Sequence, residues 1–265
     1  MSKQITLRFY RELNDFLPKD KRGREFSVDF TKTRSIKDLI ESIGIPHPEI
    51  DLIIINSDSD DARSVDFSYQ VLAGDHISVY PSLDSTADDP TIEEQAIIAE
   101  VLHHNRPQPL AEIRFVLDVH LGRLAAYLRL LGFDTWYKND CDDPALAKLS
   151  ASEQRMLLTC DRLLLMRKQV SYGYLVRNRQ PKQQLLEVLS HFDLTSKTRP
   201  FTRCMHCNGM TQAVDKQAIA TELLPKTMEY YNEFFQCESC KKVYWKGSHY
   251  QKLKQMVDKL NIPPQ

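Results

Sequence analysis

The stretch FVLDVHLGRLAAYLRLLGFDTWYKNDCDDPALAKLSASEQRMLLTCD, residues 115–161, decides the fold class of the larger part of the chain. Short β-forming runs alternate in it with amphipathic helical segments. The expected strands are 113–117, 133–137 and 155–159, the expected helices begin near Leu121 and at Asp143, and a strand at 172–176 precedes a helix from Pro181. This order predicts a parallel sheet with right-handed crossovers, and therefore an α/β domain over residues 111–198.

Carboxylates follow the ends of these expected strands. Asp118 comes directly after the first, the pair Asp142-Asp143 follows the second, and Asp161 follows the third. Ligands of open α/β sheets bind outside the carboxyl ends of the strands, and gathered oxygen ligands favour Mg²⁺ or Mn²⁺. The other interpretation stays open: the aspartates only form turns and helix caps, with Asp143 as the N-cap ahead of Pro144.

A family resemblance adds to this pattern. The run FVLDVHLGRLAAYLRLLGFDTWYKND and the later segment YGYLVRNRQPKQQLLEVL (172–189) resemble the mut-7 C-terminal RNase domain, a PIN-like nuclease family. The resemblance extends from about Glu112 to the end of the chain. It implies a hydrolytic RNase site whose catalytic, metal-binding carboxylates are Asp118, either Asp142 or Asp143, and Asp161, and whose phosphate contacts are Arg123 and Arg162.

Two details of the resemblance concern individual positions. Asp143 is preferred over Asp142 as the ligand, because it is expected to open the helix. The family has Thr-Arg-Asp where this chain has Thr159-Cys160-Asp161. A phosphate contact from the middle position is therefore missing, whereas the carboxylate is retained.

Four of the six cysteines form two CxxC pairs, Cys204-Met-His-Cys207 and Cys237-Glu-Ser-Cys240, separated by 29 residues. Two such turns can place four thiolates on one tetrahedral Zn²⁺, which indicates a structural zinc ribbon within residues 199–265. The ion would stabilise a segment that has few apolar residues. Redox use is the alternative, but a redox pair needs only two cysteines.

Basic and aromatic side chains mark the expected RNA-binding surface. Lys241 and Lys242 lie near Tyr244 and Trp245, a mixture that suits stacking on unpaired bases and contact with phosphates. The alternative is that the aromatic rings pack the ribbon core. In the α/β domain, Arg129 also belongs to the basic set, unless it only solvates a helix face.

The first third of the chain is expected to form a small half-buried sheet. Apolar and polar residues alternate at 5–10 and 26–30, a helical pattern covers 36–43, and further strands are expected at 52–55 and 77–79. This order suggests a β-grasp. The segments ITLRFYRELNDFLP and IGIPHPEIDLIIIN resemble the ubiquitin-like module found beside mut-7 C-terminal RNase domains. The module, residues 1–83, continues into more chain and lacks the free Gly-Gly end of sulfur carriers, so a docking or regulatory role is expected.

Charge divides the chain in the same way. Residues 1–90 carry 11 basic and 17 acidic side chains, residues 91–110 carry one and three, and residues 111–265 carry 23 and 16. The net charge of −1 is therefore the sum of an acidic module, an acidic linker at 84–110 and a basic remainder. His103 and His104 in the linker have no partners at ligand spacing. No apolar stretch is long enough for a membrane span or a signal peptide, so a cytoplasmic protein is expected.

Together, these patterns predict a multidomain chain of the α+β and α/β classes: a ubiquitin-like β-grasp, a PIN-like parallel-sheet domain and a zinc ribbon. The expected function is a metal-dependent RNase with Mg²⁺ or Mn²⁺ at the aspartates, structural Zn²⁺ at the cysteines and RNA as partner. The alternative is a non-catalytic RNA-binding or adaptor protein that recruits a protein partner through the ubiquitin-like module.

Overall fold

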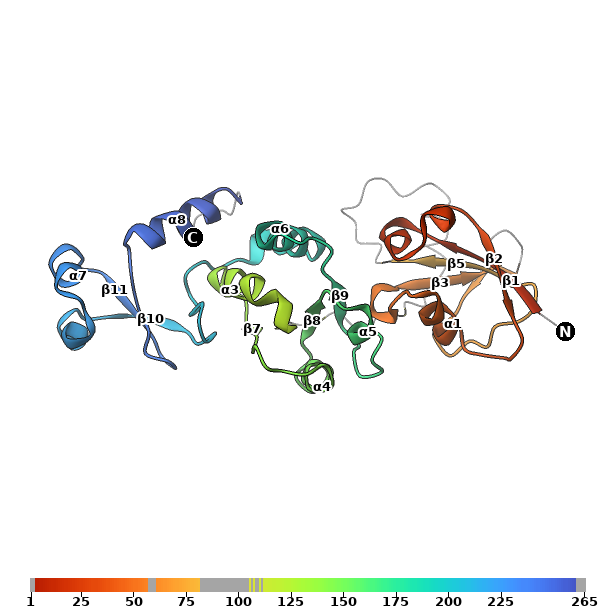
Figure 1. Cartoon of the computed structure of the whole chain (residues 1–265), viewed down its shortest axis with the longest axis horizontal. Helices are drawn as coiled ribbons and strands as arrows, with labels where there is room; N and C mark the ends of the chain where they lie inside the picture. The colour runs from red at the N-terminus through yellow and green to blue at the C-terminus, as the bar shows by residue number, and fades with distance from the viewer. Residues whose placement is uncertain are drawn as a thin grey trace. The chain divides into compact units, whose positions relative to one another are not determined.

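The computed structural model describes residues 3–56, 61–81, 105, 107, 110 and 112–260 (Figure 1). The chain divides into two units. The first comprises residues 1–110, 150–153 and 161–175, and the second comprises 111–149, 154–160 and 176–265. Most of the expected linker, including His103 and His104, lies outside the described residues. Within the described ranges, no helix combines the length and the apolar composition needed to cross a bilayer.

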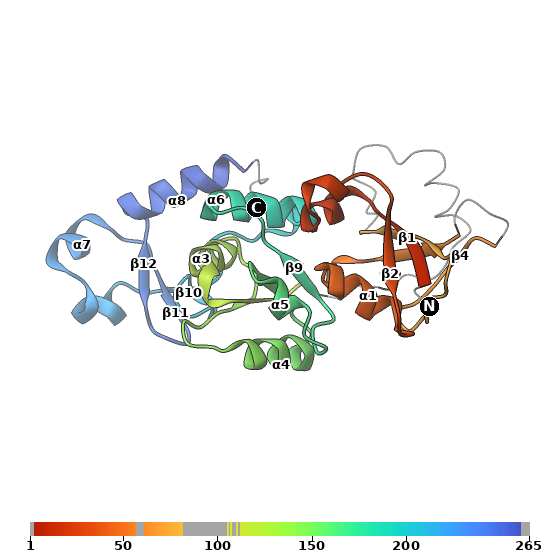
Figure 2. The same cartoon turned by 45° about the vertical axis from the view of Figure 1, so that its right-hand side comes forward.

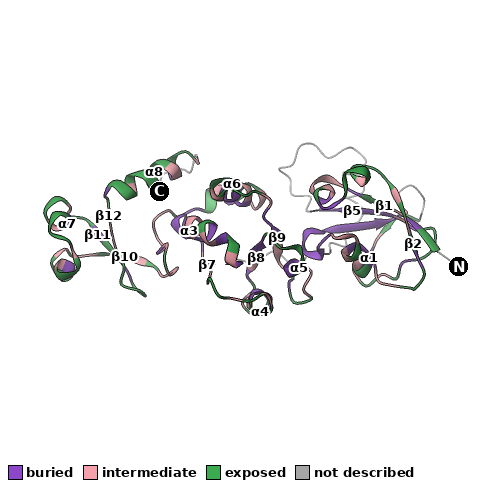
Figure 3. Ribbon diagram, in the orientation of Figure 1, coloured by how far each residue is buried: buried purple, intermediate pink, exposed green. Residues whose placement is uncertain are grey.

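The first unit contains a five-stranded sheet in the order β2-β1-β5-β3-β4. Its strands are β1 (Lys3–Phe9), β2 (Phe26–Phe30), β3 (Leu52–Ile55), β4 (Arg63–Ser64) and β5 (His76–Tyr80). β1 pairs antiparallel with β2 and parallel with β5, as in a β-grasp. All four residues of β3 are buried (Figure 3), because this strand lies inside the sheet, between β5 and β4.

Helix α1 (Ile36–Ile43) begins and ends where the sequence predicts. The Ser35 hydroxyl accepts a hydrogen bond from the backbone N–H of Asp38, and Gly44 closes the helix at a φ of 105°. The apolar face buries Ile36, Leu39 and Ile40. The expected order of strand, strand, helix, strand and strand is thus confirmed.

Residues 161–175 also belong to the first unit. They form the short helix α5 (Arg162–Leu165) and the strand β9 (Gly173–Leu175). The 3-10 turn His47–Glu49 of the β-grasp lies against β9. The packing partner of this turn therefore lies more than 120 residues away along the chain.

The parallel sheet predicted for the α/β part is present. Within the second unit, β6 (Phe115–Leu117) is the central strand and pairs parallel with β7 (Thr135–Trp136) and with β8 (Met156–Thr159). The helices of this part are α3 (Gly122–Leu130), α4 (Asp143–Glu153) and α6 (Pro181–His191). Helix α3 packs against α6 (Figure 2).

The cysteine-rich part forms a three-stranded antiparallel sheet in the order β10-β11-β12. Its strands are β10 (Thr211–Val214), β11 (Phe234–Cys237) and β12 (Val243–Trp245), and its helices are α7 (Pro225–Tyr230) and α8 (Ser248–Asp258). It lies in one unit with β6–β8.

Candidate functional site

The Asp118 carboxylate is a buried acidic group at the carboxyl end of the parallel sheet. Asp118 follows β6 directly and is only 4% exposed. Its Oδ2 accepts hydrogen bonds from the Thr159 hydroxyl and from the Cys160 N–H (3.0 Å), and its Oδ1 accepts from the His120 N–H (2.7 Å). The parallel register places Leu117 opposite Leu158, which brings the end of β8 beside this carboxylate.

The loop after β7 reaches the same end of β6. The Tyr137 hydroxyl donates to the Val119 carbonyl (2.9 Å) and lies 2.6 Å from Asn139 Oδ1. A side chain at Gly122 would collide with the Tyr137 hydroxyl, so the glycine allows this close approach. The segment that leads to Asp142 and Asp143 is thereby tied to the residue that follows Asp118.

Asp142, and not Asp143, caps helix α4. Asp142 Oδ1 accepts from the Ala145 N–H at 2.9 Å, and the Asp142 carbonyl accepts from the Leu146 N–H. The prediction of Asp143 as N-cap was therefore wrong by one residue, because Pro144 occupies the second helical position instead of the first. Asp143 is partly buried at the first helical position, and its carboxylate makes no hydrogen bond or ion pair with any other described residue.

Asp161 and Arg162 begin α5 in the first unit. The exposed Asp161 carboxylate caps this helix by accepting from the Leu163 N–H at 2.8 Å. Arg162 Nη1 donates to the Phe16 carbonyl at 3.3 Å, and its guanidinium lies 5.0 Å from the centre of the Phe16 ring. The expected phosphate contact thus interacts with the β-grasp.

The pKa of the Cys160 thiol reflects the negative charge near Asp118. Cys160 is exposed, yet its pKa is raised to about 11 by the surrounding protein atoms and by the carboxylates of Asp118 and Glu187. Glu187, on α6, accepts from the backbone N–H groups of Arg177 and Asn178 at 2.8 and 2.9 Å. The sequence interpretation missed Glu187, since it lies inside a helix and not at a strand end.

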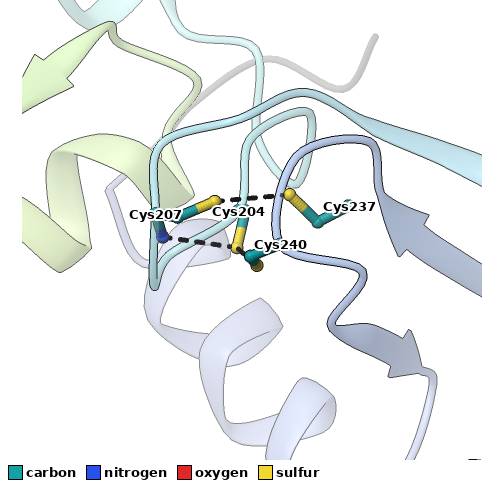
Figure 4. A group of neighbouring side chains, drawn as sticks. All are labelled: Cys204, Cys207, Cys237 and Cys240. Atoms are coloured by element: carbon teal, nitrogen blue, oxygen red, sulfur yellow. Dashed lines mark hydrogen bonds between the residues drawn. The ribbon is translucent and has the colours of Figure 1, made fainter.

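The four ribbon cysteines come together (Figure 4), as their spacing predicts. Their sulfur atoms all lie within 4.8 Å of one another. Cys204 Sγ is 3.7 Å from Cys240 Sγ, and Cys207 Sγ is 3.4 Å from Cys237 Sγ. Zn–S bonds of about 2.3 Å in a tetrahedron require sulfur separations of about 3.8 Å. The cluster therefore has the geometry to bind a metal such as zinc.

The three expected catalytic carboxylates do not form a comparable cluster. Among the described residues, the four cysteines are the one group of three or more potential ligands whose donor atoms all lie within 4.8 Å of one another. Asp118, Asp143 and Asp161 thus do not surround a point in the way that the sulfurs do.

Electrostatics around the cysteines are uneven. Burial raises the pKa of Cys204, but hydrogen bonds from the Tyr244 hydroxyl (3.0 Å) and from backbone N–H groups outweigh it and bring the pKa down to about 7. Burial raises the pKa of Cys240 to about 12. The thiolate of Cys204 therefore forms more readily than that of Cys240.

Arg129 connects α3 to the first cysteine turn. It is 5% exposed, and its guanidinium donates to the backbone carbonyls of Thr135 (2.9 Å), Met205 (3.3 Å) and His206 (2.8 Å). Burial lowers its pKa, against the opposing effect of Cys204, Cys207 and Asp134. Both sequence interpretations of Arg129, an RNA contact or a solvated residue, were wrong, because a helix position alone does not show which distant loop covers it.

The remaining candidate RNA contacts lie at the surface. Arg123 on the first turn of α3 is exposed, as are Lys241 and Lys242. Tyr244 contacts Cys204 through its hydroxyl, which matches the core-packing alternative, whereas Trp245 is 37% exposed. Of these candidate residues, one ring and three cations are thus exposed to solvent.

Comparisons with known proteins agree with this architecture. A family model described as Mut7-C RNAse domain matches residues 113–257, and one described as Mut7-C ubiquitin matches residues 2–87. Searches of curated proteins and of solved structures gave no match. The first match spans the parallel sheet and the four cysteines together and covers more than half of the chain. The chain therefore belongs to the Mut7-C RNAse domain family, with a Mut7-C ubiquitin module at its N-terminal end.

Proposed function

We propose that this protein is a metal-dependent ribonuclease that hydrolyses RNA phosphodiester bonds at the carboxyl end of the β6–β8 sheet. Membership of the Mut7-C RNAse domain family supports a nuclease function. The observation that carries the finer proposal is the buried Asp118 carboxylate, held at a strand end by Thr159 and Cys160. Burying a carboxylate costs free energy, which indicates that its position serves a purpose beyond capping a turn.

Each candidate residue has a role in this proposal. Asp118 is the ordered oxygen donor, and Asp143 and Asp161 contribute further negative charge to the site. Asp143 is the more suitable member of its pair, because the Asp142 carboxylate is already occupied by its cap hydrogen bond. A divalent ion bound at such carboxylates would neutralise charge and activate water for attack on phosphorus. Exposed Arg123 and Arg162 would bind phosphates.

The cysteine cluster has a structural role in the proposal. Zinc at Cys204, Cys207, Cys237 and Cys240 would hold the two turns that flank β10 and β11, and would present Lys241 and Lys242, which follow the last ligand. These lysines and Trp245 would bind single-stranded RNA through phosphate contacts and stacking.

A second function also has structural support. Asp118, Asp142 and Asp161 each accept a backbone N–H at the start of a helical turn. Capping alone therefore accounts for part of their placement, as it would in an RNA-binding or adaptor protein without catalytic activity. The two functions differ in one measurable property, cleavage.

The test is cleavage of a mixed RNA pool by the full chain. Asp118→Asn and Asp161→Asn should each lower the rate constant at least about a hundredfold, with RNA affinity retained. Asp142→Asn is the matched control for Asp143→Asn. Asparagine can still cap a helix, so Asp142→Asn removes only the charge and should leave the cleavage rate nearly unchanged. RNA binding without cleavage by the wild-type chain would support the adaptor function instead, whereas equal cleavage by wild type, Asp118→Asn and Asp161→Asn would place the catalytic site elsewhere.

Metal dependence needs a design that keeps the two kinds of site apart, because EDTA also removes zinc. The stripped chain is supplied with Zn²⁺ alone, with Mg²⁺ or Mn²⁺ alone, or with both. Zinc alone should restore the fold of residues 199–260 without cleavage, and cleavage should require Mg²⁺ or Mn²⁺ in addition. Cleavage restored by zinc alone would contradict the proposed catalytic ion.

A further inference from the structure

The β-grasp binds residues 161–175 through buried polar groups. Glu49 is 3% exposed and its Oε1 accepts from the Leu175 N–H at 2.6 Å. His47 is 7% exposed, and its Nε2 lies 2.8 Å from the Val170 carbonyl oxygen. Buried charged groups are costly unless they have partners, and here the partners lie in another part of the sequence. This contact therefore depends on the particular polar groups of Glu49 and His47.

The 3-10 turn that carries these side chains is rigid and fits closely. Pro46 and Pro48 flank His47, which limits the backbone of the turn. His47 Nδ1 lies 2.7 Å from Glu41 Oε1 on α1, so the ring is held between a carboxylate and the Val170 carbonyl. A side chain at Gly173 would collide with Leu165 and press on Val170 within the same segment, and would lie in ordinary contact with Pro48, so the glycine allows β9 to pack closely on its own segment beside the turn.

The same module also contacts the start of the segment. Phe16, which is 5% exposed, supplies a carbonyl and a ring face to Arg162. Gly44, at the end of α1, lies near the same guanidinium. The module therefore holds residues 161–175 at both ends, at Arg162 and at Leu175.

Residues 161–175 are joined by peptide bonds to Cys160 and Val176, whose contacts lie near Asp118. Asp161 follows directly on Cys160, whose N–H donates to Asp118. Val176 follows directly on Leu175, and its N–H donates to the Thr159 carbonyl at 2.8 Å. Whatever holds 161–175 therefore restrains a loop whose two ends are anchored beside the Asp118 carboxylate.

We propose that the ubiquitin-like module acts on the nuclease site through its Pro46–Ile50 turn, with Glu49 and His47 as positioning residues for Asp161 and Arg162. The module is thus an internal partner that orders one part of the site. The inference rests on the proposed function, since Asp161 and Arg162 are the residues positioned.

The experiment compares Glu49→Ala, Glu49→Gln and Asp75→Ala in the full chain. Glutamine keeps an oxygen that can accept from the Leu175 N–H, so Glu49→Gln should behave closer to wild type. Asp75 is the matched control: it is a buried carboxylate of the same module, 6% exposed, and accepts from the Tyr69 hydroxyl and the Leu72 N–H within that module.

Hydrogen exchange gives the first readout. Glu49→Ala should speed amide exchange in residues 161–175 by about tenfold to a hundredfold, the range set by loss of one hydrogen bond to a charged acceptor. Residues 122–130 serve as the internal reference and should exchange as in wild type. Unchanged exchange in residues 161–175 of Glu49→Ala would overturn the proposal.

Steady-state cleavage gives the second readout. Glu49→Ala should lower kcat and raise KM, Glu49→Gln should restore most of both, and Asp75→Ala should change neither at a temperature where the module stays folded. Faster exchange with unchanged kcat and KM would overturn the positioning role alone. A wild-type chain that does not cleave RNA would overturn the proposed function itself, and with it this inference about the ubiquitin-like module.

Discussion

Replacing Arg129 by methionine tests whether the cysteine turn and α3 form one structural body. Arg129 donates three hydrogen bonds to backbone carbonyls while almost fully buried. Methionine has a similar length but no donor, so the carbonyls of Thr135, Met205 and His206 would lose a charged partner.

The magnitude follows from these contacts. Hydrogen bonds with a charged partner contribute about 1.5–3 kcal/mol each, so three would give about 4.5–9 kcal/mol if they were additive. Desolvation of the guanidinium, which also lowers the pKa of Arg129, opposes this gain. We expect Arg129→Met to lower the free energy of unfolding by about 3–5 kcal/mol, as observed when one partner of a buried charged contact is removed.

The assay is chemical denaturation of the zinc-loaded chain, together with the rate of zinc transfer to a chromophoric chelator. Arg123→Met is the matched control, because Arg123 lies on the same helix but is exposed and should change stability by less than about 0.5 kcal/mol. Zinc release should be faster in Arg129→Met, since the cation lies close enough to Cys204 and Cys207 for them to affect its pKa. Equal stability and equal zinc release in the two variants would refute the reasoning.

Three further predictions concern single residues. Gly132→Ala should destabilise the chain by about 1–3 kcal/mol in thermal or chemical unfolding, because Gly132 has a φ of 91° and an added side chain would collide with the Arg199 carbonyl. Unchanged stability of Gly132→Ala would contradict that close approach. Asp142→Ala should lower the free energy of unfolding by about 1 kcal/mol, and Asp142→Asn should lower it much less, as measured by the same unfolding experiment. Equal losses in the two variants would show that the cap hydrogen bond is unimportant. Cys160, with its pKa raised to about 11, should react with iodoacetamide at pH 8 roughly a hundredfold more slowly than a thiol of pKa 9, because only the thiolate reacts, and its rate should keep rising up to about pH 11. Glu187→Gln should speed this alkylation by removing a negative charge, and an unchanged rate would place Glu187 too far away to act.

Local patterns in the sequence were sufficient for most of the fold. Alternating apolar residues in β1 and β2, the Ser35 cap and the Gly44 stop of α1, and the strand-helix alternation after Ile113 all act over a few residues. The two CxxC pairs likewise indicated a cluster that the structure assembles. Such features are readable because hydrogen bonds and side-chain periodicity within one element determine them.

Positions that depend on distant contacts were not readable in this way. The sequence shows an aspartate pair before Pro144, but only the backbone conformation shows that Asp142 makes the cap and leaves Asp143 without one. Glu187 on α6 and Arg129 on α3 look like ordinary helix residues until their partners at 177–178 and 205–206 are known.

The sequence by itself determined the classes of structure in this protein: a β-grasp, a parallel sheet with acidic strand ends, and a four-cysteine ribbon. Only the tertiary structure decided which polar groups are buried and which residues are their hydrogen-bond partners. The clearest case is the pair His47 and Glu49, whose partners Val170 and Leu175 are more than 120 residues away. The physical reason is that a buried polar group is defined by the atoms that exclude water from it, and those atoms come from elsewhere in the chain.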